Sequence, residues 1–294
     1  MTFARPDHIC DCETIPRMAS WVTSARAETL EDVAFLSGAA LNHLHLVLGR
    51  AEVPHALLRD RLALRAAEAC VAFSGRSERA GELRDAVHLL RPGDLPGPAG
   101  ETCLAWRCAV ERPASIKALG RALPDFQAER IATWLDRGQG GPVIRAAMVL
   151  EAVLTEAPRA EVAALILADA VVAQALGWEY LVPLLAAGLK RADLRKQGEG
   201  LRLACHRALV ASTVEAVRQA TELTRGAGYL KAVAPKLRAK GAGAAVEMFL
   251  ARDAVAPSAL PLPDRAARRL CDRLVELGAV RELTGRDTFR LYGV

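Results

Sequence analysis

Residues 264–277 read DRAARRLCDRLVEL, and Gly278 follows them. At 100° per residue, the leucines of this segment fall on one side of a helix and the arginines fall on the other. The segment therefore predicts an amphipathic helix whose apolar side is buried. Gly278 stands where a glycine commonly ends a helix in the left-handed conformation.

The sequence around this helix is interrupted by turns. A basic segment with two glycines, 235–243, precedes a helix expected over 244–251, and the three prolines of 256–263 predict a loop. After the amphipathic helix, two short β-prone runs flank the tripeptide 285–287, which predicts a hairpin. The order of helix, turn, amphipathic helix and hairpin predicts a winged-helix-like module over 233–294.

The basic side chains of this module predict contact with DNA. Arginines in the first turns of a recognition helix can reach guanine edges or hold phosphates. From Lys190 to Val294 the chain holds 20 Lys and Arg against 11 Asp and Glu, whereas the rest of the chain is acidic. The expected DNA-binding residues are Lys236, Arg238 and Lys240 before the helix, Arg265, Arg268 and Arg269 on it, and Arg286 in the hairpin.

Two other interpretations of the module stand beside this one. An amphipathic helix with a charged outer face is common at protein surfaces and needs no ligand. Winged helices also bind other proteins, and the chain would then be a helical scaffold for a protein partner. The sequence therefore has two candidate partners, DNA and another protein.

The rest of the chain is expected to be helical. Hydrophobic residues make up 52% of the sequence but aromatic residues only 4%, and the excess lies in Ala, Leu and Val. We expect an all-α fold, with a multi-helix orthogonal bundle over 20–232 that follows an irregular segment, 1–19. The expected helices, the first of them capped by Thr29, cover about 29–49, 54–75, 77–90, 101–111, 113–121, 125–137, 142–156, 159–176, 180–196, 199–226 and 228–240.

The N-terminal region and the cysteines predict a cytoplasmic protein. The first twenty residues lack the apolar core of a secretory signal, and the seven cysteines are an odd number, typical of reduced thiols that pack as small core residues. The most apolar stretch, 162–189, contains Asp169, Glu179 and Pro183. It therefore predicts a buried helical hairpin, and no membrane span is expected.

A polar cluster is predicted beside a loop rich in proline and glycine. Residues 91–100 contain three prolines and three glycines and are expected to form a rigid loop instead of a helix. His88 follows Asp85 at the helical spacing of three, and Arg91 and Asp94 lie at the start of the loop. These four residues predict either a ligand-binding or enzymatic site, or ion pairs that hold the loop against the helices.

The sequence carries no motif for a metal, a cofactor or a catalytic centre. His8, Cys10 and Cys12 are spaced too tightly for a zinc knuckle, and His43 and His45 point to different faces of a helix. The chain has neither a phosphate-binding loop with Lys and Ser or Thr nor a Gly-x-Ser-x-Gly elbow. We therefore expect no metal and no cofactor, and a binding protein more than an enzyme.

Four stretches of the chain are similar to an uncharacterised bacterial family. Over about 20–294 the chain resembles the domain-of-unknown-function family 1403, which is often found on plasmids. The resemblance implies the extent of the fold and a setting on a mobile element, but no activity, and residues 8–12 depart from the family. The four stretches are 34–41 (AFLSGAAL), 83–100 (LRDAVHLLRPGDLPGPAG), 233–243 (VAPKLRAKGAG) and 264–293.

The last of these stretches also resembles the C-terminal winged helix of bacterial Fic-type proteins. Those proteins carry a catalytic motif of the type His-Pro-Phe-x-x-Gly-Asn-Gly-Arg, which this sequence lacks. AMP transfer is therefore not implied. Together, the residues and the resemblances favour a DNA-binding or regulatory protein of a mobile element.

Overall fold

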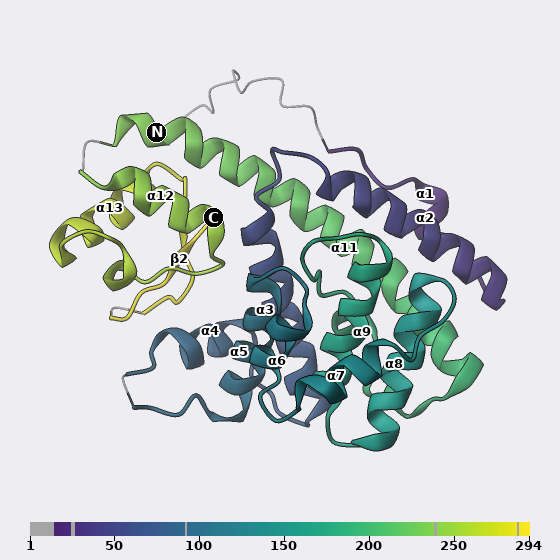
Figure 1. Ribbon diagram of the computed structural model, residues 1–294. Coiled ribbons are helices and arrows are strands. Elements are labelled where there is room, and N and C mark those ends of the chain that lie inside the picture. Colours follow the sequence, from purple (N-terminus) through teal and green to yellow (C-terminus); the bar gives the residue numbers. More distant parts are fainter. Residues whose placement is uncertain (1–14, 25–26, 92, 238–239, 287) are drawn as a thin grey trace.

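The computed structural model describes residues 15–24, 27–91, 93–237, 240–286 and 288–294. In these residues the chain is mostly helical, with one short antiparallel strand pair near its C-terminal end (Figure 1). The predicted all-α fold with a terminal hairpin is confirmed. The elements are α1 (Ser20–Ser24), α2 (Leu30–Leu48), α3 (His55–Phe73), α4 (Ala80–His88), α5 (Gly97–Glu111), α6 (Ile116–Ala122), α7 (Ala128–Leu135), α8 (Pro142–Glu156), α9 (Glu161–Ala175), α10 (Leu185–Gly188), η1 (Arg191–Arg195), α11 (Gly198–Val233), η2 (Ala234–Lys236), α12 (Ala242–Ala251), η3 (Pro257–Ala259), α13 (Asp264–Glu276), β1 (Arg281–Glu282) and β2 (Tyr292–Gly293).

Local signals in the sequence set the ends of several helices. Thr29 caps α2 as predicted, because its hydroxyl accepts the main-chain N–H of Asp32 at 3.2 Å and donates to the Asp32 carboxylate at 2.8 Å. Gly278, with a φ of 67°, follows α13 as predicted. The helices expected over 142–156 and 264–277 are confirmed as α8 and α13.

Two of the expected segments are wrong. Residues 97–100 form the first turn of α5, because Pro98 lies where a missing N–H breaks no helical hydrogen bond. The single helix expected over 180–196 is broken into α10 and η1. Pro183 has no N–H to continue a helix, and the next two N–H groups bond to Asp169.

The helix break expected between residues 226 and 228 is also wrong. α11 continues through both glycines to Val233. Gly226 marks a close contact, because a Cβ atom there would lie 2.5 Å from Cγ1 of Val294. The glycine therefore lets the last residue of the chain pack directly on α11.

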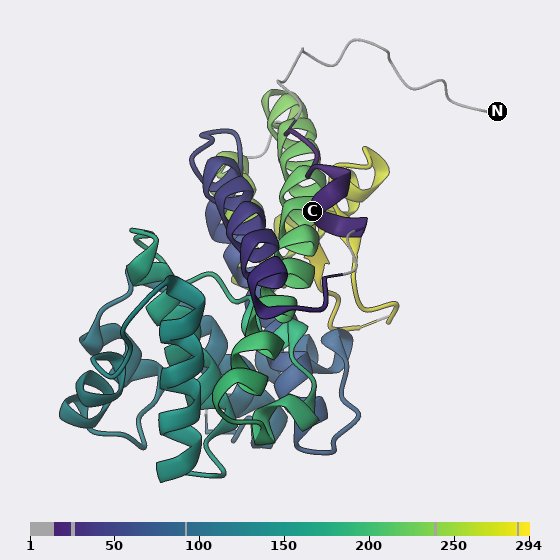
Figure 2. The ribbon, with the colours of Figure 1, turned by 90° about the vertical axis from the view of Figure 1, so that its right-hand side faces the viewer.

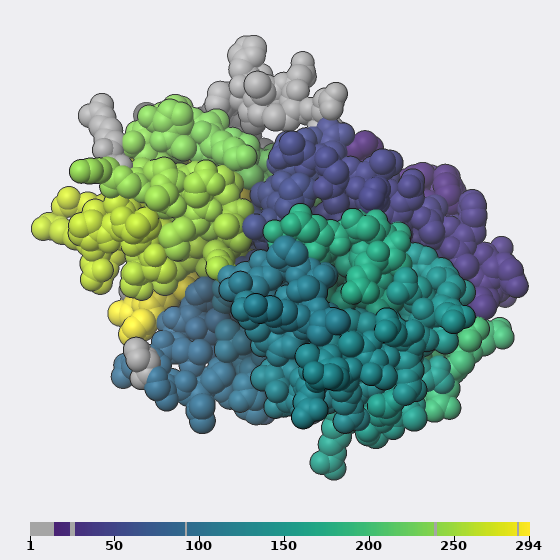
Figure 3. Space-filling view, in the orientation of Figure 1, coloured from purple at the N-terminus to yellow at the C-terminus, as the bar shows by residue number. Residues whose placement is uncertain are grey.

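α11 belongs to two hydrophobic cores. The larger core takes in α2 to α10 and α11 as far as Leu223, with α2 lying along α11 (Figure 2). The smaller core gathers the last turns of α11, from Ala227 on, with α12, α13 and β2. We call residues 242–293 the C-terminal module, which forms the left side of the molecule in Figure 3, opposite α2. A domain boundary at 232/233 stays a prediction, since α11 contributes to both cores.

α9 lies inside the larger core. Its residues from Ala163 to Ala173 are all buried, so no side of this helix faces water. None of the helices in the described ranges is both long and apolar enough to cross a membrane. The apolar stretch 162–189 thus forms a buried helix, an irregular return and the short α10.

Asp169 is a carboxyl group inside this core. It is 1% exposed and accepts the main-chain N–H groups of Leu184 at 3.0 Å and Leu185 at 3.1 Å. Burial disfavours the charged form more than these two hydrogen bonds favour it, and it raises the pKa of Asp169 to about 8. The side chain therefore fixes the segment after Pro183 and is protonated at neutral pH.

Asp169→Asn is expected to flatten the dependence of stability on pH. The unfolded chain loses the Asp169 proton near the ordinary pKa of 3.8, whereas the folded protein keeps it up to about pH 8. Between these values the unfolded state binds fewer protons, so the free energy of unfolding falls by up to ~1.4 kcal/mol per pH unit as the pH rises. Denaturant unfolding of both proteins across this range measures the difference in slope.

Asp125→Asn is the control for this prediction, because Asp125 is exposed. It should keep the slope of the unmodified protein. An Asp169→Asn variant with that same slope would contradict the assignment of a neutral, buried carboxyl group.

Candidate functional site

The C-terminal module consists of two helices and three short extended segments. α12 leads through Val255, η3 and α13 to the strand pair. In that pair β1 and β2 are antiparallel, with Arg281 opposite Gly293. On the other side of β2, the main chain of Tyr292 exchanges two hydrogen bonds with Val255, at 2.8 Å and 3.0 Å. β2 therefore lies between Val255 and β1.

α13 is held by one face and presents the other to solvent. Its apolar residues are buried in the smaller core, and the hydroxyl of Tyr229 on α11 donates to the Leu277 carbonyl at 2.8 Å. Arg265, Arg268 and Arg269 are exposed, and they form no hydrogen bond or ion pair with any part of the chain that the structure describes. The first two turns of α13 thus carry three unpaired guanidinium groups.

The other basic residues predicted to bind DNA do not lie on α13. Lys236 and Lys240 are exposed between α11 and α12, and Arg238 lies outside the described residues. Arg286 is paired, since its Nη2 atom lies 2.5 Å from Oδ2 of Asp85 on α4. The structure therefore brings the three α13 arginines together on one face and places Arg286 at the junction with α4.

The four residues of the predicted polar cluster do not face one another. Asp85 pairs with Arg286, and His88 borders a small interior cavity. The main-chain N–H of Arg91 donates to the Asp94 carboxylate at 2.9 Å, which closes a turn in the exposed loop. The cluster is thus divided among three surroundings.

The histidines and cysteines of the described residues are not arranged to bind a metal. No group of three or more His, Cys, Asp and Glu side chains in those residues could hold a metal ion. The His43 ring bonds to the Pro16 carbonyl at 2.9 Å, and the His45 ring accepts the indole N–H of Trp178 at 3.0 Å. His8, Cys10 and Cys12 lie outside the described residues.

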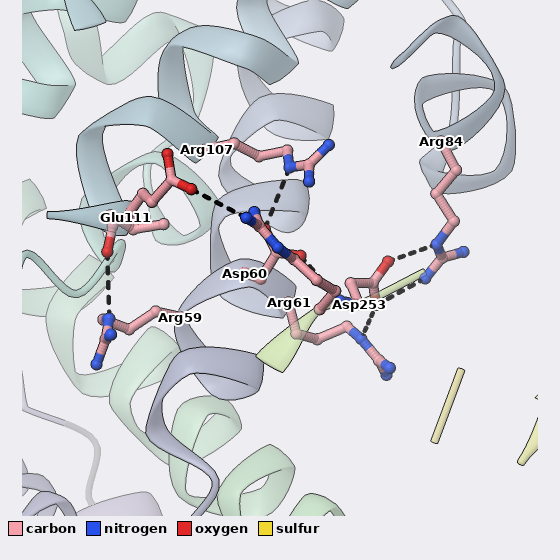
Figure 4. Close-up of polar contacts among 9 residues, drawn as sticks. Arg59, Asp60, Arg61, Arg84, Arg107, Glu111 and Asp253 are labelled. Carbon is pink, nitrogen blue, oxygen red and sulfur yellow. Dashed lines mark hydrogen bonds and ion pairs between the residues drawn. The ribbon is translucent and has the colours of Figure 1, made fainter. Parts of the chain in front are cut away.

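A buried ionic cluster joins the C-terminal module to α3, α4 and α5 (Figure 4). The carboxylate of Asp253, a residue that is 4% exposed, pairs with Arg61 and lies 2.6 Å and 3.2 Å from Nε and Nη2 of Arg84. The main-chain N–H of Asp253 donates to Asp60 Oδ2 at 2.8 Å, and Asp60 pairs with Arg107 at 3.3 Å. Two buried carboxylates thus meet three guanidinium groups whose side chains are only partly exposed.

Burial and the charges of this cluster together shift the pKa values of Asp253 and His88. Burial raises the pKa of Asp253, but the hydrogen bonds from Arg84 and the charge of Arg61 outweigh it, and the net shift is downward. Burial, helped by the charge of Arg107, lowers the pKa of His88 to about 4, so its ring is neutral at pH 7. The cavity between these side chains measures about 10 Å³, the space of one water molecule.

Further contacts surround the ionic cluster. Arg252 pairs with Glu111 at 2.9 Å, and Arg61 also donates to the oxygen of Val294 at 3.3 Å. Figure 4 labels Arg61, Glu111 and Arg59. The guanidinium of Arg59 lies 3.9 Å from the centre of the Tyr180 ring. The contacts of Arg252 and Arg61 therefore add to those that fix the module to the helical body.

The candidate residues predicted from the sequence include neither Asp60 nor Asp253. Asp60 lies three residues after Leu57 and four before Leu64, so helical spacing places a charge on the buried face of α3. That spacing is the signal that could have marked it. Asp253 follows the end of α12, and no local pattern distinguishes it from an exposed acid.

Asp253→Ala is expected to destabilise the protein by up to roughly 3–5 kcal/mol, because Arg61 and Arg84, whose side chains are only 14% and 15% exposed, would lose their carboxylate. Urea unfolding followed by circular dichroism measures the change. Asp272→Ala, at an exposed acid on α13, is the control and should change stability by less than about 0.5 kcal/mol. Equal effects of the two substitutions would refute the role of the ionic cluster.

Comparisons with known proteins place the chain in a family without assigning it an activity. A search of the curated proteins found no match. A family model described as a protein of unknown function (DUF1403) matches residues 6–294. This match begins earlier than the resemblance seen in the sequence, which started near residue 20, and it includes residues 8–12. The chain therefore belongs to the DUF1403 family of proteins of unknown function.

Proposed function

We propose that this protein binds double-stranded DNA through the outer face of α13, in a regulatory role. One observation carries the proposal: Arg265, Arg268 and Arg269 are exposed and unpaired within the described residues, on the first two turns of a helix whose opposite face is buried. Their guanidinium groups are therefore available to a polyanion without breaking a contact inside the protein.

The spacing of these arginines suits a groove of DNA. Residues three and four apart lie on one helix face, within about one turn of 5.4 Å. The major groove is about 12 Å wide and admits a helix, and an arginine there can bond a guanine edge with two N–H groups or hold a phosphate. Because the buried face of α13 packs in the smaller core, the arginines project from a fixed support.

The order of elements in the module supports the same proposal. A helix, a short extended segment, a turn, a second helix and an antiparallel pair follow one another, and the middle strand β2 contacts both Val255 and β1. This is the order of a winged helix, with the single turn of η3 in the place of one helix. Lys236 and Lys240 are proposed as phosphate contacts. Arg286 is left out, because Asp85 balances its charge.

The alternative partner is another protein with an acidic surface, which would use the same arginines as a docking face. DNA and an acidic protein surface differ in the density of negative charge that they carry. DNA binding releases condensed counterions, so the logarithm of the affinity falls linearly with the logarithm of the salt concentration, by about 0.9 per phosphate contact. The salt dependence therefore discriminates between DNA and a protein.

The triple variant Arg265/Arg268/Arg269→Ala should bind duplex DNA at least about tenfold more weakly than the unmodified protein, since it loses three contacts to phosphates or bases. If all three arginines hold phosphates, the slope of log affinity against log salt should shrink by about 2.7. Fluorescence anisotropy with labelled duplexes at several salt concentrations measures both quantities.

The matched control removes three other exposed cations that have no hydrogen bond or ion pair within the described ranges. Arg112, Lys117 and Arg121 lie on and before α6, in the helical body. Their triple alanine variant has the same change of net charge and should bind DNA like the unmodified protein. Equal losses in both variants would show a diffuse charge effect, and binding that does not respond to salt would exclude the proposed mode.

A further inference from the structure

The outer face of α2 exposes large apolar side chains. Phe35 is 68% exposed and Leu46 is 62% exposed, although both lie on a helix that is buried along its other side. Trp21 of α1, itself 50% exposed, stacks on Phe35 with ring centres 5.6 Å apart. α1 and α2 lie against α11 at the side of the molecule that faces the viewer in Figure 2. Scattered exposed apolar residues are ordinary, but a grouped set marks a contact surface.

The residues between Phe35 and Leu46 on this face are small. Gly38 and Asn42 are exposed, and Ala39 is partly so. A Cβ atom at Gly38 would meet nothing within 4 Å, so the packing of the described residues does not require a glycine there. A glycine in the middle of a helix lowers helix stability compared with alanine, but it lets another backbone approach closely. The face therefore has a shallow centre between two large apolar ends.

We propose that this face binds a second copy of the same chain, with the two α2 helices antiparallel. In a two-fold symmetric dimer the same surface of both copies forms the interface, so each contact between two different residues occurs twice. With the axis near the middle of α2, Phe35 lies opposite Leu46 of the second copy, and Ala39 lies opposite Asn42. Each large apolar residue then meets an apolar partner, and the small residues let the helices approach at the centre.

Charge favours the antiparallel direction over the parallel one. The first turn of α2 carries Glu31 and Asp32, whereas Arg50 follows its last turn and also bonds to Glu52. Antiparallel pairing keeps the two acidic first turns apart, places each of them beside the Arg50–Glu52 pair of the other copy, and sets the two helix dipoles in opposition. Parallel pairing would instead set each residue against its own copy, with Glu31 beside Glu31 and Asp32 beside Asp32, so that the two acidic first turns repel each other.

The dimer would have a defined shape. α2 and α13 lie on opposite sides of the chain in Figure 1, so pairing through α2 leaves both C-terminal modules at the outer ends. The proposal does not depend on DNA binding, because α2 contributes nothing to the face of α13. Failure of one proposal is therefore distinguishable from failure of the other.

Sedimentation velocity of the full chain over a range of concentrations, without DNA, tests the proposal. The unmodified protein should form a dimer, and Phe35→Glu and Gly38→Gln should each raise the dimer dissociation constant at least about a hundredfold. Gly38→Gln adds a side chain into open space in the single chain, so it should fold normally. Leu95→Glu is the control, because Leu95 is 87% exposed and lies in the loop between α4 and α5, away from α2. This substitution should leave the dimer intact.

A photo-crosslinking amino acid, benzoylphenylalanine, in place of Phe35 then tests the direction of pairing. Mass spectrometry should find crosslinks from position 35 to the segment 42–50 of the second copy. An unmodified protein that stays monomeric would overturn the proposal and leave the face to a different protein. A dimer that survives both α2 substitutions, or crosslinks between the two positions 35, would overturn it as well.

Discussion

The placement of the C-terminal module depends on one buried carboxylate, Asp253. Removing two carboxylates and three guanidinium groups from water is unfavourable, and only close pairing and complete hydrogen bonding offset the loss. The Asp253 side chain meets Arg61 and Arg84, and its main-chain N–H meets Asp60. Few other dockings of α12 on α3 and α4 would satisfy these groups together. The cluster therefore restricts how α12 can dock on α3 and α4, and the neighbouring His88 ring, which is neutral at pH 7, adds no further positive charge to it.

A second, apolar constraint acts through α11. Its first part lies in the larger core and its last turns lie in the smaller one, so one continuous helix carries the module. The module is therefore held at two separate places. The ionic cluster holds the end of α12 against α3 and α4, and the smaller core holds the inner face of α13 against α11. The outer face of α13 is left toward solvent at the side of the molecule (Figure 1). The arginines on this face are therefore exposed by the architecture itself.

Helix periodicity was enough to predict the fold class and the inner and outer faces of α13, because both follow from spacing within one segment. Caps such as Thr29 and Gly278 were readable for the same reason. Except at the start of α5, where Pro98 is a local signal, the errors arose where a distant residue decides the local structure. Asp169 accepts the main-chain N–H groups that follow Pro183, and the close packing of Val294 on α11 requires a glycine at position 226. The ionic cluster joins Asp60 to a residue 193 positions later, and no single segment contains that information. The exposure of the α13 arginines was predictable, whereas the pairing of Arg286 with Asp85 was not.

The long sequence separation within the ionic cluster has a consequence for biosynthesis. A chain leaves the ribosome from its N-terminal end, and helical segments can pack as they emerge. Arg61, Arg84 and Asp60 emerge long before Asp253, so during most of translation these arginines have no carboxylate from the module and must remain hydrated. Arg61 also awaits the oxygen of Val294, which is made later still. The helical body can therefore pack before residues 242–293 are made, whereas its charged surface stays hydrated until the C-terminal module docks on it.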